Sequence, residues 1–146
     1  MIIREAVTAD VEALISLGCK LVDDLLDLRS DRQKIRRMIT TSISSSAHLL
    51  LIAEEDKELV GAIIVGTETF SFAEKMYGTI AGFHYKSPDV GGLLIKVVMQ
   101  WIHSRKAVQL VTYTMPVKTD VDRLLLEHDF ESTGSMLIWR RYGISK

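Results

Sequence analysis

The sequence has little of what would tie a protein to a membrane, an oxidising compartment or a nucleic acid. Its single cysteine, Cys19, excludes an intramolecular disulfide. No apolar run approaches the roughly 18 residues of a membrane span, and the N-terminus has no apolar signal core. The net charge is only −1, so no broad positive field gathers phosphate backbones. We therefore expect a cytoplasmic protein that binds neither a membrane nor a nucleic acid.

What the sequence does have is the composition of an ordinary globular domain. Over 146 residues, apolar types make up 47% and charged types 25%. A chain of this length can bury roughly 70% of the surface that its unfolded form exposes. No internal repeat and no long low-complexity segment divides it, so we expect residues 1–146 to form a single domain.

Hydrophobic periodicity predicts the order β-α-α-β-β-β-α-β-α-β. Three antiparallel strands followed by a β-α-β-α-β half favour a mixed sheet with helices on both faces. We expect an α/β (α+β) protein with about six to seven strands and about four helices. The predicted strands are residues 1–5, 48–55, 59–70, 77–86, 108–114 and 135–142, and the predicted helices are 8–28, 31–43, one with its apolar face from Leu94 to Trp101, and 120–128.

Capping signals predict where the first two helices begin. Thr8 or Asp10 can accept hydrogen bonds from the free amides of the first helix. Ser30, followed three residues later by Gln33, has the pattern of a capping box for the second.

The stretch "SPDVGG", residues 87–92, has two interpretations. Free amides at a helix N-terminus attract an anion, and glycines let the backbone approach it closely. The same residues are also typical of a helix that starts at a proline and binds nothing. In that case Asp89 caps the helix itself by accepting from the amides of Gly91 or Gly92. Spacing alone leaves both open.

Three phrases resemble the GNAT superfamily of acyl-coenzyme A dependent N-acetyltransferases: "IREAVTADVEALISL", "LLIAEEDKELVGAIIV" and "LLLEHDFESTGSML". The resemblance covers nearly the whole chain. In the third phrase Phe130 stands at the phenylalanine of the family's glycine-phenylalanine pair, and Asp129 replaces the glycine. The residues around Trp101 are similar to compact members encoded by bacteriophages.

The resemblance implies that acetyl-coenzyme A lies between two splayed parallel strands, one ending near Phe83 and one beginning near Val108. The family's turn motif, a basic or amide residue and two small residues, falls on Lys86, Asp89 and Gly91. Asp89 therefore places a carboxylate where a phosphate is expected, and like charges about 6 Å apart repel by roughly 3 kcal/mol at an effective dielectric near 20. The implied cofactor-binding residues are Phe83, His84, Tyr85, Lys86, Asp89, Val90, Gly91, Gly92 and Leu93.

Acetyl transfer to an amine needs a base, an oxyanion donor and often an acid. The resemblance puts the family's usual acid, a tyrosine, at Leu125, where it is missing. Tyr113 is the candidate acid, and Glu68 and His84 are the candidate bases, with Glu74 less well placed. Each also has a structural interpretation, as a half-buried strand residue or a solvated charge. No histidine spacing marks a metal site.

We expect an N-acetyltransferase that modifies an amine of a small molecule or protein by direct transfer. Aspartates 23, 24, 27 and 31 form either an acidic rim for a cationic amine or a solvated helix face. The alternative function is a degenerate member, a binding or assembly module that has lost catalysis, and Asp89 and Leu125 favour it. Family members often pair through their C-terminal strands, so a homodimer is a further expectation.

Overall fold

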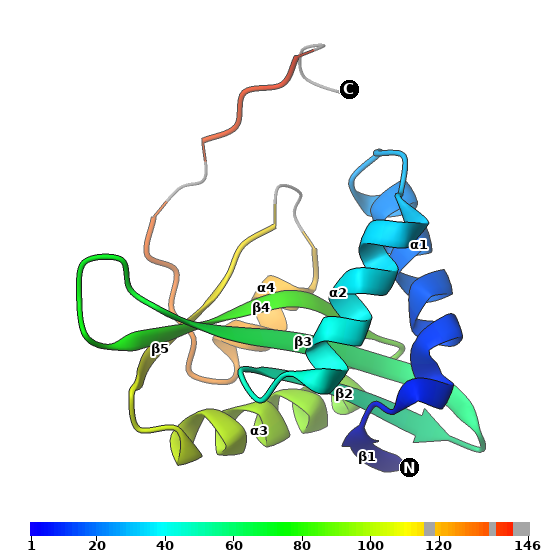
Figure 1. The fold of residues 1–146 in the computed structure, drawn as a ribbon, viewed down its shortest axis with the longest axis horizontal. Helices are drawn as coiled ribbons and strands as arrows, with labels where there is room; N and C mark the ends of the chain where they lie inside the picture. Colours follow the sequence, from blue (N-terminus) through cyan, green and yellow to red (C-terminus); the bar gives the residue numbers. More distant parts are fainter. Residues whose placement is uncertain (116–118, 135–136, 142–146) are drawn as a thin grey trace.

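The computed structural model describes residues 1–115, 119–134 and 137–141. Its centre is a five-stranded sheet in the order β1-β2-β3-β4-β5, with helices on both faces (Figure 1). Neighbouring strands are antiparallel from β1 to β4, whereas β4 and β5 are parallel. The elements are β1 (Ile2–Glu5), a 3-10 turn (Thr8–Asp10), α1 (Val11–Leu25), α2 (Arg32–Ser44), β2 (His48–Glu55), β3 (Glu58–Thr69), β4 (Met76–Tyr85), α3 (Pro88–Ser104), β5 (Val108–Tyr113) and α4 (Val121–Leu126).

The predicted mixed sheet and its element order are confirmed from β1 to α4, but the predicted strand count is too high. Residues 137–141 of the expected closing strand form no strand, and residues 135, 136 and 142 lie outside the described residues. Leu137 is 94% exposed and Trp139 is 76% exposed. Because their apolar side chains are not buried against a neighbour, nothing offsets the entropy of ordering a strand there. Figure 1 shows this segment leading away from the sheet.

Two apolar cores lie on opposite faces of the sheet, because alternate strand residues point to opposite sides. One core joins the sheet to α1 and α2, and the other joins it to α3 and α4. The first core contains Leu14, Ile15, Ile35, Ile39, Leu50, Ile52 and Ile64, and the second contains Leu49, Leu51, Ile63, Val65, Leu94, Ile95, Val98, Leu124 and Leu125.

Among the described residues, no helix combines the length and the apolar character needed to cross a membrane.

The helix starts differ from the predicted caps. Asp31, and not Ser30, caps α2, because its side chain accepts from the amides of Gln33 and Lys34 at 3.1 Å. Ser30 instead donates its own amide to Asp23 at 2.9 Å. The capping residue lies one position later than predicted, which shifts the helix start but not its apolar face.

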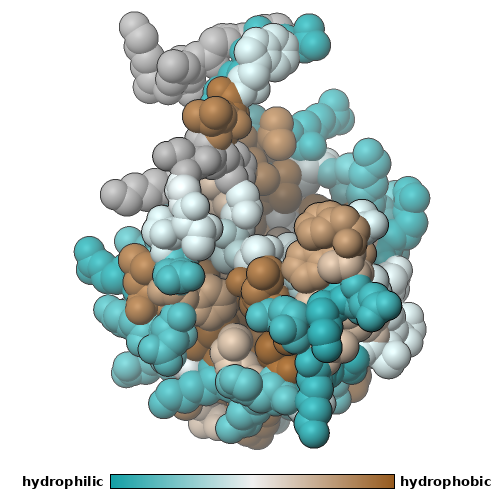
Figure 2. Space-filling model, turned by 90° about the vertical axis from the view of Figure 1, so that its left-hand side faces the viewer, coloured by the Kyte–Doolittle hydropathy of each residue, from teal (hydrophilic) through white to brown (hydrophobic). Residues whose placement is uncertain are grey.

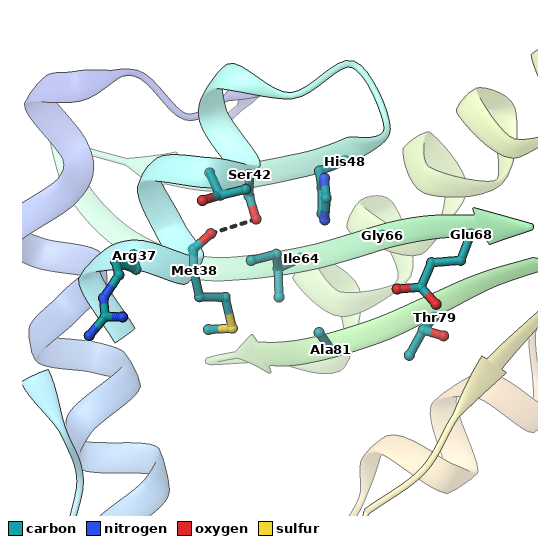
Figure 3. A pocket seen from close by; sticks show the side chains of 10 residues that line it. Arg37, Met38, Ser42, His48, Ile64, Gly66, Glu68, Thr79 and Ala81 are labelled. Carbon is teal, nitrogen blue, oxygen red and sulfur yellow. Dashed lines mark hydrogen bonds between the residues drawn. The ribbon is translucent and has the colours of Figure 1, made fainter. Parts of the chain in front are cut away.

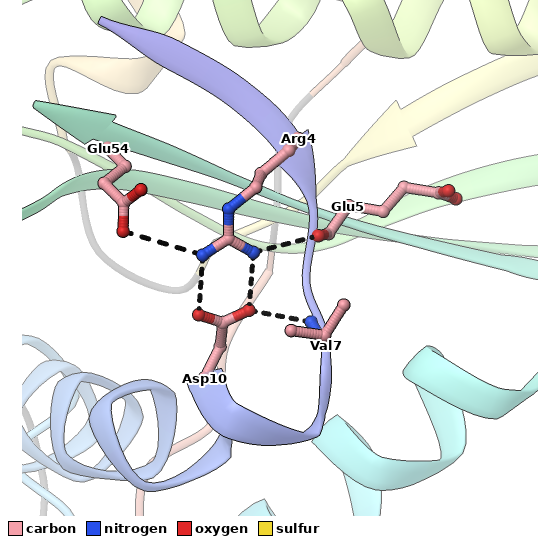
Figure 4. Close-up of polar contacts among 5 residues, drawn as sticks. All are labelled: Arg4, Glu5, Val7, Asp10 and Glu54. Atoms are coloured by element: carbon pink, nitrogen blue, oxygen red, sulfur yellow. Dashed lines mark hydrogen bonds and ion pairs between the residues drawn. The ribbon is translucent and has the colours of Figure 1, made fainter. Parts of the chain in front are cut away.

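Arg4 of β1 fastens the 3-10 turn to the edge of the sheet (Figure 4). Its two terminal nitrogens, Nη1 and Nη2, contact Asp10 Oδ2 and Oδ1 at 2.8 and 2.9 Å, and Nη2 lies 3.6 Å from Glu54. Asp10 also accepts from the Val7 amide at 2.7 Å. The hydrogen bond from Arg4 is the main cause that lowers the pKa of Asp10. Asp10 therefore closes the turn before α1, and it makes no side-chain cap on α1 itself.

The end of α4 explains the aspartate at position 129. Asp129 has a φ of 68°, in the left-handed region that glycine tolerates best. The amide of Phe130 then bonds back to the carbonyl of Leu125 at 3.1 Å, which closes the helix. Aspartate is among the few other residue types that adopt this conformation at modest cost.

The turn between β3 and β4 carries an aromatic cluster at one end of the molecule. Phe70 packs against Phe72 and Tyr77, with ring centroids 5.4 and 4.9 Å apart. Figure 2 looks at this end and shows apolar patches set among hydrophilic side chains. The cluster holds Tyr77 beside β3, where its hydroxyl reaches Glu68.

Candidate functional site

Strand β4 extends beyond its parallel partner β5. Their pairing ends at Ile80 opposite Tyr113, whereas β4 continues to Tyr85. At the same point β4 bulges against β3, because Val65 pairs with Ile80 and Ile64 pairs with Gly82. Ala81 therefore has no ladder partner in β3 or β5. A bulge at the place where two strands part leaves backbone donors and acceptors free for another molecule.

Ala81 also lines a cavity of about 420 Å³ on the α2 face of the sheet (Figure 3). This volume lies within the range of small-molecule sites. Helix α2 forms one wall, and β2, β3 and β4 form the floor. The lining residues are Arg37, Met38, Thr41, Ser42, His48, Ile64, Gly66, Glu68, Thr79 and Ala81.

Glu68 is the predicted base that lies in this cavity. Its carboxylate accepts from the Tyr77 hydroxyl at 2.9 Å, and this bond is the main cause that raises the pKa of Tyr77. The alternation of β3 directs Ile64, Gly66 and Glu68 to the same face of the sheet. A carboxylate at this position can attract an ammonium group and accept a proton from it.

His48 was not among the predicted site residues, yet it lines the same cavity. It pairs across the hairpin with Gly66, and its ring covers that glycine: a Cβ there would lie 3.2 Å from His48 Cδ2 and 3.3 Å from Nε2. The buried Nδ1 atom has no hydrogen-bond partner among the described residues. One sequence feature could have indicated this contact: in the predicted β2–β3 hairpin, His48 falls opposite a glycine, Gly66.

His84, the other predicted base, is not brought together with Glu68. Both belong to the same face, but His84 pairs with Ala62 and Glu68 pairs with Tyr77. Six residues along β3 separate the two pairs, which is about 20 Å. His84 does not line the cavity. Burial, and then the nearby Lys20 and Lys86, lower the pKa of His84, so the ring is neutral at pH 7.

Tyr113 lies on the α3 and α4 face, at the end of β5 and opposite Ile80. Burial is the main cause that raises its pKa, so the hydroxyl stays protonated at neutral pH. Leu125 is 4% exposed and belongs to the core below α3. The position that the resemblance assigns to the acid is therefore occupied by a buried core leucine. Tyr113 places a hydroxyl where β4 and β5 stop pairing.

The start of α3 is capped by Ser87. Its Oγ accepts from the Val90 amide at 3.5 Å, and the Gly91 amide already bonds to the Ser87 carbonyl at 3.1 Å. The alternative in which Asp89 caps its own helix is wrong, because Asp89 is exposed in the first turn and Ser87 is the cap. Lys86 lies 3.6 Å from Glu58, so part of its charge is balanced.

Close packing within the protein explains why residue 91 is a glycine. A Cβ there would lie 2.6 Å from Leu124 Cδ2 and 2.8 Å from Tyr85 Cδ1, closer than real Cβ contacts. At the adjacent Gly92 the nearest atom is the His128 Nε2, at 3.2 Å and on a side chain that can move. Of the other residues predicted to bind the cofactor, Phe83 and Val90 are buried, Tyr85 is half-buried and Leu93 is exposed.

Compared by structure, the chain has the fold of the GNAT acetyltransferases. It matches a GNAT family acetyltransferase from Staphylococcus aureus over 95% of this chain and 97% of the other, with a TM-score of 0.64 and 18% identity. It matches an aminoglycoside antibiotic 6'-N-acetyltransferase from Acinetobacter haemolyticus over 99% and 100%, with a TM-score of 0.73 and 14% identity. A transcriptional regulator from Bacillus halodurans matches over 95% and 98%, with a TM-score of 0.74 and 20% identity.

Compared as a sequence, the chain matches no protein-family model and no curated protein. The structural likeness therefore establishes the fold, and the activity has to be argued from the residues of the site.

The two glycines of α3 provide a matched test of the packing. Gly91→Ala should lower the free energy of unfolding by about 1–2 kcal/mol, because the methyl group overpacks the contact with Leu124 and Tyr85. Gly92→Ala should be neutral or stabilising by up to about 1 kcal/mol, since alanine is the better helix former. Urea denaturation of both variants measures the difference. Equal stabilities would show that α3 does not pack on α4 this closely.

Proposed function

We propose that the protein is an acetyl-coenzyme A dependent N-acetyltransferase. The observation that carries this proposal is the position of Ala81. It is the bulged residue at the parting of β4 and β5, and it also lines the cavity on the α2 face. The cavity on the α2 face and the end of the β4–β5 ladder meet at this residue. An acetyl donor and an acceptor amine can therefore approach each other there.

The chain's own residues supply four roles: an oxyanion donor, a diphosphate site, a base and an acid. The unpaired backbone of Ala81 and the adjoining part of β4 offers hydrogen bonds to the thioester carbonyl and to the charge that develops on its oxygen. Acetyl-coenzyme A supplies the activated acyl group. The first turn of α3 offers the Asp89 amide and the weakly bonded Val90 amide to a diphosphate, although the Asp89 carboxylate opposes it.

Glu68 is the proposed base, because of the two predicted bases it alone lines the cavity that Ala81 reaches. Its negative charge attracts the ammonium form of an acceptor, and its oxygen can then take the proton directly or through a water molecule. Tyr113 is the proposed acid for the leaving thiolate. Its raised pKa keeps the hydroxyl protonated, and it ends β5 at the parting.

Two residues near these positions favour the alternative function, a protein without catalysis. Asp89 at the start of α3 and the buried Leu125 both favour the alternative of a binding module without transferase activity. That alternative predicts no uptake of acetyl-coenzyme A by the natural protein, and uptake by an Asp89 variant alone would mean that the carboxylate has closed the site. The two functions are therefore separated by binding as well as by turnover.

Glu68→Gln keeps the shape of the side chain and an oxygen for Tyr77, but it removes the basic carboxylate. We expect kcat/KM for an amine acceptor to fall by about 100-fold or more, as for loss of a general base. Glu74→Gln, in the β3–β4 turn, is the matched control and should change kcat/KM less than about twofold. His84→Gln should retain most of the activity. A fully active Glu68→Gln enzyme with an inactive His84→Gln variant would reverse the assignment.

Asp89→Asn removes the carboxylate from the first turn of α3 without changing its size. Acetyl-coenzyme A should bind this variant up to about tenfold more tightly at low ionic strength, and the gain should shrink in high salt. Titration calorimetry measures both affinities, with Glu74→Gln as the control at the far end of β4. If neither the natural protein nor Asp89→Asn takes up acetyl-coenzyme A, the transferase proposal fails.

A further inference from the structure

Helix α2 carries three arginines, and they differ in whether an acidic side chain pairs with them. Arg32 and Arg36 both contact Glu12 of α1, at 3.2 and 2.7 Å. Arg37 lines the cavity, and no carboxylate among the described residues pairs with it. A guanidinium group that faces a cavity without an acidic partner can bind a carboxylate through two parallel hydrogen bonds.

A charge of opposite sign lies at the other end of the cavity. Figure 3 shows Glu68 and Arg37 at opposite ends, with Ile64 and Met38 between them. Four residues of β3, from Ile64 to Glu68, correspond to about 13 Å of strand. Arg37 and Glu68 form no ion pair with each other. Glu68 has the Tyr77 hydroxyl as its hydrogen-bond partner among the described residues, and this bond leaves carboxylate lone pairs free.

Between these charges the cavity lining combines an apolar surface with polar side chains. Met38 and Ile64 supply hydrocarbon, whereas Ser42 is already used because its hydroxyl donates to the Met38 carbonyl at 2.8 Å. The buried Nδ1 of His48 has no partner among the described residues. A buried polar atom without a partner is costly, and a ligand in the cavity reaches this one only if the His48 ring turns.

We propose that the acceptor is a zwitterion: a primary amine whose molecule also carries a carboxylate, separated from the amine by a short hydrocarbon chain. Arg37 binds the carboxylate, and Glu68 receives the amine at the opposite end of the cavity. The chain lies on Met38 and Ile64. The inference rests on the proposed function and adds to it the class of acceptor, which the fold does not determine.

Three matched probes test the carboxylate: 5-aminopentanoate, 5-aminopentanamide and 1-aminopentane. Their binding is measured by titration calorimetry without acetyl-coenzyme A, and their acetylation is measured separately. The natural protein should bind 5-aminopentanoate about tenfold more tightly than either of the other two, as expected for a hydrogen-bonded charge pair. Arg37→Gln should remove this preference, and Arg37→Glu should shift it towards 1,5-diaminopentane.

Arg32→Gln is the control, since it removes the same charge from the same helix outside the cavity lining. It should keep the preference for 5-aminopentanoate. Arg37 is exposed, so its variants should fold, and thermal unfolding checks this. Equal binding of the three probes by the natural protein, an unchanged preference in Arg37→Gln, or no binding of any probe would overturn the inference.

Failure of the zwitterion inference can be distinguished from failure of the transferase proposal. Acetylation of all three amines with equal kcat/KM refutes the zwitterion and leaves the transferase intact. Binding of 5-aminopentanoate that depends on Arg37, in a protein that acetylates none of the probes, supports the zwitterion site and contradicts the transferase.

Discussion

The difference in length between β4 and β5 is the constraint on which the rest of the site depends. Their parallel ladder ends at Ile80 and Tyr113, and five further residues of β4 continue without that neighbour. A backbone that loses its ladder partner must find water or a ligand, because unpaired donors and acceptors are costly when buried. Ala81 is exposed and bulged at this point. The parting therefore keeps open a hydrogen-bonding edge that a longer β5 would close.

Packing on the two faces of the sheet holds the parting in place. On one face, α3 and α4 pack closely enough that Gly91 has no room for a side chain. On the other face, α2 leaves a cavity beside the bulge while its apolar residues join the core with α1. Ala81 therefore lines the cavity and also lies at the end of the β4–β5 ladder.

Local patterns predicted the elements well, because the helices have apolar residues at helical spacing and the central strands are short apolar runs. They failed for residues 137–141, where an apolar run is present but the apolar side chains stay exposed. A strand needs a partner, and no local pattern reports whether one is in place. The predicted capping residue of α2 was wrong by one position for a similar reason. Ser30 and Asp31 are both good caps, and the contact of Ser30 with Asp23 in α1 decides between them.

The site was only partly predictable. Glu68 could be predicted because it ends a hairpin strand, and its neighbours in the register follow from the turn. Arg37 and His48 could not be assigned to a site, because the cavity exists only once α2 lies over β2 and β3. His84 has the chemistry of a base, yet the length of β3 places it far from Glu68. Residue type suggested the chemistry, and non-local packing decided which residues share a cavity.

The open edge of β4 is tested most directly by amide chemical shifts. In nitrogen-15-labelled protein, saturating acetyl-coenzyme A should produce its largest shifts at the amides of residues 81–85, with small shifts along β2, which lies on the far side of β3. Binding that shifts only other parts of the chain, or no shift at saturating ligand, would contradict the account.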